Sequence, residues 1–253
     1  MTFRVVQLTD CHLYADPERA MNGILTRPRL ELALEDVRGR VPDFDLLVVT
    51  GDTASDESLV AYQAFRESLG DWVQRLRIVP GNHDDRTFLR SVFPEACADT
   101  AGRVIFRAAT SGWQLIGLDT QLSGETAGEL GDEQLAWLGG VLDGEPGLDT
   151  VLFLHHPPID VGSPWVDRIR LRDASALGRL LDEHPQAGIV FSGHVHQEAS
   201  GVLGGATVHT TPAVGPQFVP NSAEFEIQPG PPGYRIIELD SDGSCSTSIV
   251  RCG

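Results

Sequence analysis

The sequence predicts an α/β fold, because strand-like and helix-like segments alternate along its 253 residues. Short runs rich in Val, Ile, Leu and Phe recur, and several are apolar throughout, as expected for strands that are covered on both faces. Between these runs, apolar residues recur every three or four positions, which is the spacing of one helix face. A chain of this length can bury one sizeable core, and we expect residues 1–253 to form a single domain.

Nine apolar runs are predicted to be β-strands. They cover residues 3–8, 46–49, 76–79, 104–108, 114–118, 151–154, 188–191, 206–209 and 234–239. Each is four to six residues long, which is an ordinary strand length.

Four segments carry the apolar periodicity of helices. They lie around residues 30–37, 59–69, 135–142 and 177–181. Pro28 comes just before the first stripe, near a helix start, where proline is tolerated. Asp132 and Asp173 precede the third and fourth stripes, and we expect each to cap its helix.

Residues 215–233 form the one irregular stretch, which is rich in proline and glycine. Phe218 and Phe225 are available there to pack against the rest of the domain. A long loop in a compact domain is usually functional or flexible. We expect this loop to pack near the mouth of the functional site.

The composition excludes several classes of function. With a formal net charge of −17, the chain lacks the basic surface that a nucleic-acid partner requires. No apolar run approaches the roughly 20 residues of a membrane span, and the N-terminus has no secretory signal, so we expect a cytoplasmic protein. All 19 basic residues are arginine, which excludes a phosphate-loop lysine or a lysine nucleophile. The four cysteines form no C-x-x-C pair and are expected to be free thiols.

Six of the eight histidines lie in short clusters beside Asp, Asn or Gly, and each cluster follows an apolar run. The clusters are Asp10-Cys11-His12, Gly51-Asp52, Gly81-Asn82-His83-Asp84, His155-His156 and Gly193-His194-Val195-His196. Sites in open α/β sheets form at the carboxyl ends of strands, so these distant segments can converge. Together they supply enough nitrogen and oxygen donors for two divalent ions, a centre suited to phosphate-ester hydrolysis.

Local geometry supports this interpretation of the clusters. Asp10 and His12 are two residues apart, so both side chains face the same side if the segment is extended. His194 and His196 repeat that spacing and can be shared between two ions. The Asp52 carboxylate has two oxygens and is suited to bridging two cations.

Each cluster also has an ordinary structural interpretation. Gly-Asp after a strand is usually a turn, His-His-Pro-Pro can be a rigid loop, and Gly-His-x-His can be a surface pair. Gly-Asn-His-Asp is the most specific single cluster. The occurrence of all five in this order favours the metal centre over five unrelated turns.

The clusters resemble the pattern of the calcineurin-like metallophosphoesterase superfamily, which is D-x-H, G-D, G-N-H-[DE], H and G-H-x-H. Every element is present between Asp10 and His196. The resemblance implies a four-layer α/β/β/α sandwich with a dimetal site at the strand ends. The protein-phosphatase branch favours Gly-Asp-x-x-Asp-Arg-Gly, whereas this chain has Gly51-Asp52-Thr53-Ala54-Ser55-Asp56, which argues against that branch.

The resemblance also implies roles for individual residues. One ion would be held by Asp10, His12, Asp52 and His196, and the second by the bridging Asp52 together with Asn82, His155 and His194. His83 would steady the phosphate and protonate the leaving group, so His83, Asn82 and Asp52 are the expected catalytic residues. His155 is favoured over His156 because it comes first after its strand.

A narrower resemblance covers nearly the whole chain. Residues 8–13, 167–172, 217–221 and 232–235 are similar to segments of the bacterial class III cyclic nucleotide phosphodiesterases. This implies hydrolysis of a phosphodiester, most of all 3′,5′-cyclic AMP to its 5′-monophosphate, with a small-molecule substrate. Related enzymes are often dimeric, but no feature of the chain marks a self-association surface, so a homodimer stays open.

Two other functions fit the same ligand set. The first is a hydrolase of glycerophosphodiesters or other small phosphodiesters, and the second, from another class, is a non-catalytic scaffold. The intact ligand positions argue against the scaffold. His209, Thr210 and Asn221 are candidates to line the substrate pocket. A ligand set of nitrogen and oxygen atoms suits Fe, Mn, Zn or Co, and the resemblance favours Fe or Mn.

Overall fold

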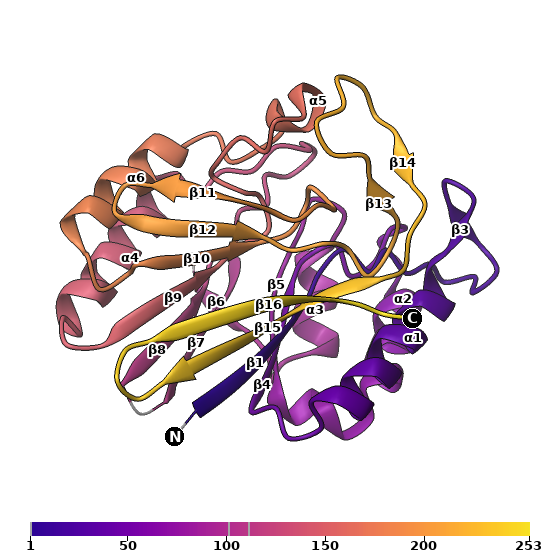
Figure 1. Ribbon diagram of the computed structural model, residues 1–253, viewed down its shortest axis with the longest axis horizontal. Coiled ribbons are helices and arrows are strands. Elements are labelled where there is room, and N and C mark those ends of the chain that lie inside the picture. The colour runs from indigo at the N-terminus through magenta and orange to yellow at the C-terminus, as the bar shows by residue number, and fades with distance from the viewer. Residues whose placement is uncertain (1, 101, 111) are drawn as a thin grey trace.

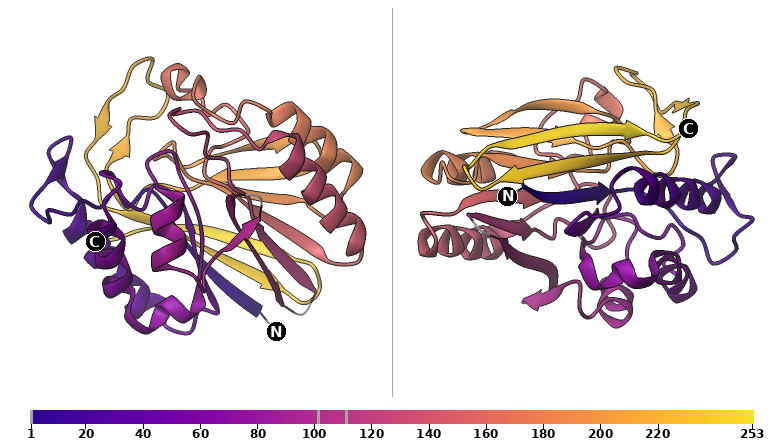
Figure 2. Two further views of the ribbon diagram at one scale, coloured as in Figure 1. Left: turned by 180° about the vertical axis from the view of Figure 1, so that it is seen from behind. Right: turned by 60° about the horizontal axis from the view of Figure 1, so that its bottom comes forward.

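The computed structural model describes residues 2–100, 102–110 and 112–253. Its main feature is a pair of β-sheets that lie face to face (Figure 1 and the right-hand view of Figure 2). One sheet has the strand order β16-β15-β1-β4-β5, and the other has the order β11-β12-β10-β9-β8-β7-β6. The strands of the two sheets are β1 Thr2–Leu8, β4 Leu46–Thr50, β5 Leu76–Val79, β6 Ala98–Thr100, β7 Arg103–Thr110, β8 Trp113–Gly117, β9 Asp149–Phe153, β10 Ile189–Ser192, β11 Ala199–Leu203, β12 Ala206–Thr210, β15 Gly233–Asp240 and β16 Cys245–Arg251.

Helices cover the outer face of each sheet, which gives the four-layer α/β/β/α sandwich that the sequence resemblance implies (Figure 2). Apolar side chains of α1, α2 and α3 share one buried cluster with β1, β4 and β5. Those of α4 and α6 share another with the second sheet. The helices are α1 Thr26–Arg40, α2 Leu59–Leu69, the 3₁₀ helix η1 Gly70–Arg75, α3 Arg86–Val92, α4 Gly131–Gly144, α5 Pro164–Asp167 and α6 Ala174–Glu183.

The space between the sheets is filled by a third apolar cluster with side chains from both. Phe153 of β9 stacks on Phe191 of β10, with ring centroids 5.7 Å apart. On the other side of this layer lie Val5, Val48 and Ile237 of the first sheet. Burial on both faces explains why these strands are continuously apolar in sequence.

Strand direction places the predicted ligand clusters at one edge of the sandwich. β1, β4 and β5 are parallel to one another, and so are β8, β9, β10 and β12. The clusters that begin at Asp10, Asp52 and Asn82 follow β1, β4 and β5, while those of His155 and His194 follow β9 and β10. The two sheets therefore contribute ligand candidates to a common site from adjacent strand ends.

All nine predicted strands are present, with ends that differ by at most two residues. The prediction that Asp132 caps α4 is wrong, because Leu130 holds the cap position and Asp132 lies in the first turn. Asp173 does occupy the cap position of α6, but its side chain makes no cap hydrogen bond there. Its carboxylate instead accepts hydrogen bonds from the backbone N–H groups of Leu130 and Gly131 at the start of α4.

The proline- and glycine-rich stretch 215–233 is partly ordered into a small hairpin. β13 (Gln217–Phe218) pairs antiparallel with β14 (Ile227–Gln228), and the hairpin rises beside α5 in Figure 1. A second small hairpin joins β2 (Ala20–Met21) to β3 (Ile24–Leu25). All four cysteines are free, as the sequence predicts.

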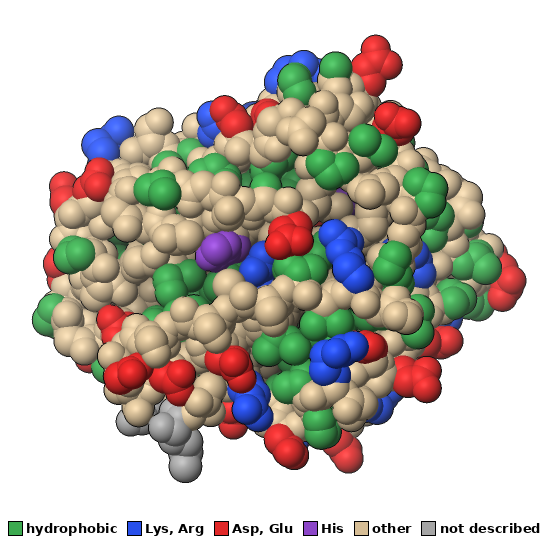
Figure 3. Space-filling model, viewed as in Figure 1, with side chains coloured by type: hydrophobic (Ala, Val, Ile, Leu, Met, Phe, Trp, Pro, Cys, Tyr) green, Lys and Arg blue, Asp and Glu red, His purple; other side chains and the backbone are tan. Residues whose placement is uncertain are grey.

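Acidic and arginine side chains are interspersed on the face that Figure 3 presents, and tan and green surface separates the arginines there. This distribution agrees with the acidic composition of the chain. Across residues 2–100, 102–110 and 112–253, we find no helix with the length and hydropathy that a bilayer crossing requires.

Candidate metal centre

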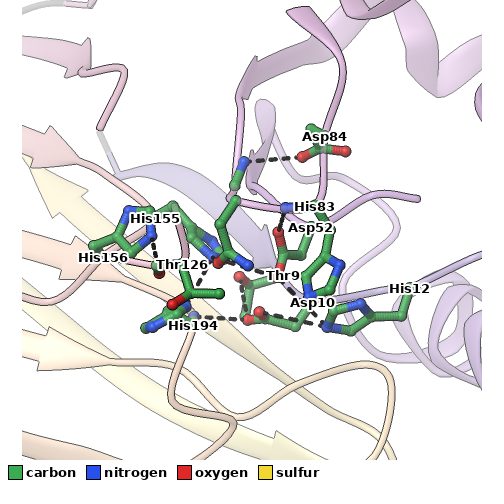
Figure 4. Close-up of polar contacts among 12 residues, drawn as sticks. Thr9, Asp10, His12, Asp52, His83, Asp84, Thr126, His155, His156 and His194 are labelled. Atoms are coloured by element: carbon green, nitrogen blue, oxygen red, sulfur yellow. Dashed lines mark hydrogen bonds and ion pairs between the residues drawn. The ribbon is translucent and has the colours of Figure 1, made fainter. Parts of the chain in front are cut away.

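The side chains of five separate segments point toward one another at the strand ends, as the close-up in Figure 4 shows for those it labels. Asp10 and His12 follow β1, and the two Asp10 oxygens differ in their surroundings. Oδ2 accepts hydrogen bonds from Thr9 Oγ1 at 2.7 Å and from the backbone N–H of His194 at 3.0 Å. Oδ1 is buried without a hydrogen bond among the described residues and lies 3.2 Å from His196 Nε2.

The expectation that Asp10-Cys11-His12 is extended is wrong. Asp10 and His12 have φ values of 54° and 50°, in the left-handed region. His194 and His196, with φ values of 68° and 50°, are not extended either. The side chains converge because these turns redirect them, and Cys11 between the first two is buried in the core of α1 and the first sheet.

Left-handed backbone is concentrated at the predicted ligands. Among the described residues, eight other than glycine have positive φ, and five of these are predicted ligands. They are Asp10, His12, Asp52, His194 and His196. Such conformations cost of order 1–3 kcal/mol each and cluster at functional sites. The backbone strain indicates that these turns serve to position the side chains of the site and are not favoured by the local sequence.

Asp52 lies between two histidines. Its Oδ2 is 3.6 Å from His12 Nε2 and 3.5 Å from His155 Nε2, and its Oδ1 accepts a hydrogen bond of 2.9 Å from the backbone N–H of His83. Gly81 lies so close that a β-carbon there would overlap the Asp52 carboxylate. One Asp52 oxygen thus faces ligand candidates on both sides, as a bridging carboxylate requires.

The remaining candidates divide into two groups around Asp52. His155 Nε2 is 3.2 Å from Asn82 Oδ1 and 3.2 Å from His194 Nδ1. On the other side, His12 Nε2 is 3.1 Å from His196 Nε2. Asn82, His155 and His194 thus form one group, and Asp10, His12 and His196 form the other. His194 and His196 belong to different groups.

Hydrogen bonds on the opposite ring nitrogen orient three of the imidazoles. Nδ1 of His155 donates to the backbone oxygen of Thr50 at 2.7 Å, and Nδ1 of His196 donates to that of Pro216 at 2.6 Å. His12 Nδ1 lies 2.8 Å from Ser55 Oγ. In all three rings Nε2 is left to face the site, which is how metal-binding histidines are usually held.

Burial and mutual charge set the protonation of the cluster in the metal-free chain. Burial lowers the pKa of His12 and of His194 to about 3, so both rings are neutral near pH 7. Burial alone would raise the pKa of Asp10, but the nearby His196 outweighs it and the pKa falls to about 2. Burial alone would lower the pKa of His155, but the Asp52 carboxylate outweighs it and the pKa rises to about 9. Ionised carboxylates and neutral imidazoles are the forms that bind metals, so His12 and His194 are ready to bind near pH 7, whereas His155 must first release a proton.

These residues fit metal ions on independent grounds. The cluster contains groups of three Asp and His side chains whose ligand atoms lie within 4.8 Å of one another. His194 Nε2 and Asp10 Oδ1 are buried without a hydrogen bond among the described residues. A buried polar atom without a partner is costly. A cation would satisfy His194 Nε2 and would also bind Asp10 Oδ1, whose near neighbour is His196 Nε2 at 3.2 Å. The donors are nitrogen and oxygen only, as first-row transition metals accept.

Comparison with known proteins agrees with this geometry. The sequence model of the calcineurin-like phosphoesterase family matches residues 3–198, a span that includes all the ligand candidates. The chain belongs to the calcineurin-like phosphoesterase family. A dimetal phosphatase from Danio rerio has the same fold, with a TM-score of 0.70 at 14% identity over 99% of both chains.

Relatives within the family are similar along nearly the whole chain. The chain is 36% identical over 248 residues to an Escherichia coli protein named 3′,5′-cyclic adenosine monophosphate phosphodiesterase CpdA, covering 98% of this chain and 89% of the relative. It is 34% identical to the CpdA of Pseudomonas aeruginosa with the same coverage. A 3′,5′-cyclic-nucleotide phosphodiesterase of Nostoc is 30% identical, over 98% of this chain and 91% of its own length.

The structure distinguishes His155 from its neighbour His156. Both ring nitrogens of His156 are occupied: Nδ1 lies 2.8 Å from Thr120 Oγ1 and Nε2 lies 3.1 Å from the backbone oxygen of Thr126. Its ring packs on those of His155 and His194, with centroids 4.8 and 4.6 Å away. His156 also lies in a group of possible ligands with His155 and His194, but its two hydrogen bonds favour His155 as the ligand candidate.

A cavity of about 170 Å³ opens beside the cluster. Asn82 and the half-buried His83 line it. The expected lining residues His209, Thr210 and Asn221 do not line it. His209 stacks on Phe191 and borders a separate cavity, because its strand turns that side chain away from the site.

Asp84 connects the two loops that carry Asp52 and Asn82. Its carboxylate accepts hydrogen bonds from the backbone N–H groups of Thr53 and Ala54, after β4, at 3.1 and 3.3 Å. It also accepts one from that of Gly81, after β5, at 2.9 Å. Burial, with the charge of Asp52 added, raises the pKa of Asp84 to about 6.

Sequence reasoning missed several residues of the site. Thr9 orients the Asp10 carboxylate, and Thr120 and Thr126 hold His156. Trp165 of α5 lines the cavity. The only sequence signal for this residue is that a tryptophan lies in a short segment bounded by proline. Phe218 and Phe225 also line the cavity, which confirms that the 215–233 loop packs at the mouth of the site.

Proposed function

We propose that this chain, as a single domain, hydrolyses 3′,5′-cyclic AMP to the 5′-monophosphate with two bound metal ions. The observation that carries the proposal is the convergence of two ligand groups on the shared carboxylate of Asp52. The choice of substrate is supported by the CpdA relatives, which align with 98% of the chain. The four free cysteines are consistent with action in the cytoplasm.

The proposed ligands of the first ion are Asp10, His12, Asp52 and His196. The second ion is assigned to Asp52 as the bridge, with Asn82, His155 and His194. A donor set of imidazole, carboxylate and amide groups without thiolate suits Fe, Mn, Zn or Co, and Fe and Mn are the proposed metals because the family resemblance favours them. When bound, such ions polarise a phosphate ester, lower the pKa of water and orient the reacting groups.

The residues of the chain have separate tasks in this proposal. Asp52 and Asp10 supply the negative charge that holds the two cations, while neutral Asn82 limits the charge that faces an anionic phosphate. His83 lines the cavity next to Asn82, and its ring packs edge-on against His12 with centroids 5.1 Å apart. We assign His83 to hydrogen-bond the phosphate and to donate a ring-nitrogen proton to the departing ribose oxygen.

A substrate panel tests the proposal. Protein reconstituted separately with Mn and Fe is assayed with 3′,5′-cyclic AMP, 2′,3′-cyclic AMP and glycerophosphodiesters. We expect the highest kcat/KM for 3′,5′-cyclic AMP. A preference for the glycerophosphodiesters would overturn the assignment in favour of that hydrolase class, and a metal-loaded protein inert toward every phosphodiester would indicate a scaffold.

The matched variants are Asp52→Ala and Asp43→Ala. Asp52 is buried between the two ligand groups, whereas Asp43 is an exposed carboxylate outside the site. Asp52→Ala should lose nearly all turnover together with bound metal, and Asp43→Ala should keep both. Wild-type turnover by Asp52→Ala with full metal content would refute the mechanism.

A further inference from the structure

One wall of the cavity beside the ligand cluster is aromatic. Trp165, Phe218 and Phe225 line the same cavity as Asp52 and His83. A molecule in this cavity therefore meets the candidate metal centre on one side and an apolar, aromatic surface on the other. The proposed cleavage of a phosphodiester uses only the first of these surfaces.

The aromatic wall consists of three rings brought together from two segments. Trp165 comes from α5, and Phe218 and Phe225 come from the hairpin region of residues 215–233. Each pair of rings has its centroids 5.2 Å apart, at interplanar angles of 64°, 88° and 71°. These are edge-to-face contacts, the favourable packing for aromatic side chains, so the three rings support one another.

The rings differ in how much of their surface is free. Phe218 lies parallel to His196, with centroids 3.9 Å apart and planes within 5°, so one of its faces is already covered. Phe225 is 48% exposed, and it is the one aromatic residue among the exposed large hydrophobic side chains of the described chain. An exposed aromatic ring beside a cavity offers a surface on which a planar ligand can pack.

The ring arrangement distinguishes two kinds of ligand. A quaternary ammonium group, such as choline, is bound by rings that surround it, each with its face within about 6 Å of the cation. Here the three rings fill the space between them by edge-to-face contact. The three rings therefore enclose no cage for a cation, whereas the exposed ring of Phe225 can stack against a planar group.

We propose that the exposed face of Phe225, supported by Trp165 and Phe218, stacks against the nucleobase of the substrate. This inference rests on the proposed function, since a nucleoside cyclic phosphate joins an anionic phosphate to a planar base. The phosphate lies at the ligand cluster and the base lies on the aromatic wall. Glycerophosphodiesters have no planar group, so the wall selects nucleotides over them.

Binding of two product-like ligands tests the base site. The Mn-loaded protein is titrated with 5′-AMP and with ribose 5-phosphate, which lacks the base, by calorimetry. The variants are Phe225→Ala, Phe225→Tyr, which keeps a stacking ring, and Val60→Ala as a control. Val60 is 52% exposed and lies on α2. The KM values for 3′,5′-cyclic AMP and for methyl ribofuranoside 3′,5′-cyclic phosphate are measured in parallel.

Stacking of a base on an aromatic ring is worth about 5- to 150-fold in affinity. Because Phe225 provides one ring face, we expect Phe225→Ala to weaken 5′-AMP binding about tenfold. It should raise the KM for cyclic AMP to a similar extent, with ribose 5-phosphate and the base-free cyclic phosphate unaffected. Phe225→Tyr should restore both values, and Val60→Ala should change neither.

Several results would overturn the base site. One is an equal loss of affinity for 5′-AMP and ribose 5-phosphate in Phe225→Ala, and another is no loss for either. Glycerophosphocholine is titrated in the same way, and a loss of affinity confined to it in Phe225→Ala would identify a cationic ligand instead. If the wild type binds 5′-AMP through Phe225 but does not hydrolyse cyclic AMP, the base site stands and the proposed function fails.

Discussion

Removing the buried carboxylate of Asp84 should destabilise the protein more than most single substitutions. Asp84 is 3% exposed and accepts hydrogen bonds from the backbone N–H groups of Thr53, Ala54 and Gly81. The hydroxyl of Tyr62 also donates to it, at 3.1 Å. In Asp84→Ala these four donors lose their common acceptor inside the protein.

The number of donors sets the size of the effect. A buried donor left without a partner costs about 1–3 kcal/mol. Water that enters the vacated space can satisfy some of the four, so we expect Asp84→Ala to lower the free energy of unfolding by about 3–5 kcal/mol. Asp84→Asn keeps one accepting oxygen and removes the repulsion from Asp52, so it should cost about 1–2 kcal/mol.

Tyr62→Phe removes a single member of the same network. The Tyr62 hydroxyl donates to Asp84 and accepts a hydrogen bond of 2.7 Å from the backbone N–H of Asp85. We expect a loss of about 1–3 kcal/mol. Tyr14→Phe is the matched control, because the hydroxyl of Tyr14 has no hydrogen bond within the described part of the chain and its ring still packs under Arg19.

Urea unfolding of metal-free protein at neutral pH measures all four variants, so that loss of metal does not contribute. The expected order of destabilisation is Asp84→Ala first, then Asp84→Asn and Tyr62→Phe, with Tyr14→Phe near zero. A change of less than 1 kcal/mol in Asp84→Ala, at an unchanged m-value, would refute the idea that this carboxylate ties the two ligand loops together.

Three further predictions concern other parts of the site. Arg86 forms two hydrogen bonds of 2.7 and 2.8 Å with the fully buried Asp119. Arg86→Ala should therefore lower the free energy of unfolding in urea by about 3 kcal/mol. A variant as stable as the wild type would contradict this prediction. Gly81→Ala should displace the Asp52 carboxylate and abolish metal binding, which is measured by mass spectrometry. The control Gly39→Ala, at a position with open space around it, should bind metal normally. Equal binding by both variants would contradict the close approach of Gly81 to the Asp52 carboxylate. Mn²⁺ at 100 times its Kd should add about 2.7 kcal/mol of stability for each of the two sites and raise Tm by about 5–10 °C per site in calorimetry. An unchanged Tm would argue against sites that only the folded state provides.

The fold was largely predictable because burial on both faces leaves a simple signal. Strands such as Leu46–Thr50 and Ile189–Ser192 are buried along almost their whole length and are apolar except for the last residue of each. Strand Cys245–Arg251 was missed, since it is an edge strand with partly exposed side chains and a mostly polar sequence. Helix Arg86–Val92 was missed because its seven residues are too few to display helical periodicity.

The predicted ligands converge in the structure, but not for the local reason that the sequence suggested. The two-residue spacing of Asp10 and His12 was attributed to an extended segment, whereas both residues are left-handed. The sequence has no glycine at these positions to indicate such a conformation. The turns are imposed by contacts between segments, such as the hydrogen bond from the His194 backbone to Asp10.

The aromatic wall depends on packing between distant segments. Trp165 and Phe225 are 60 positions apart and meet only because α5 and the 215–233 loop lie together. No local pattern predicts that contact. The prediction that His209 lines the substrate pocket is wrong for a related reason. Strand periodicity decides which face of the sheet a side chain occupies, and the ring of His209 packs on Phe191.

Anomalous X-ray diffraction from crystals of the Mn-loaded protein tests the dinuclear centre most directly. We expect two peaks about 3.5–4 Å apart, one beside His12 and His196, the other beside His155 and His194, with Asp52 in contact with both. A single peak, or a pair of peaks that Asp52 does not join, would contradict the account.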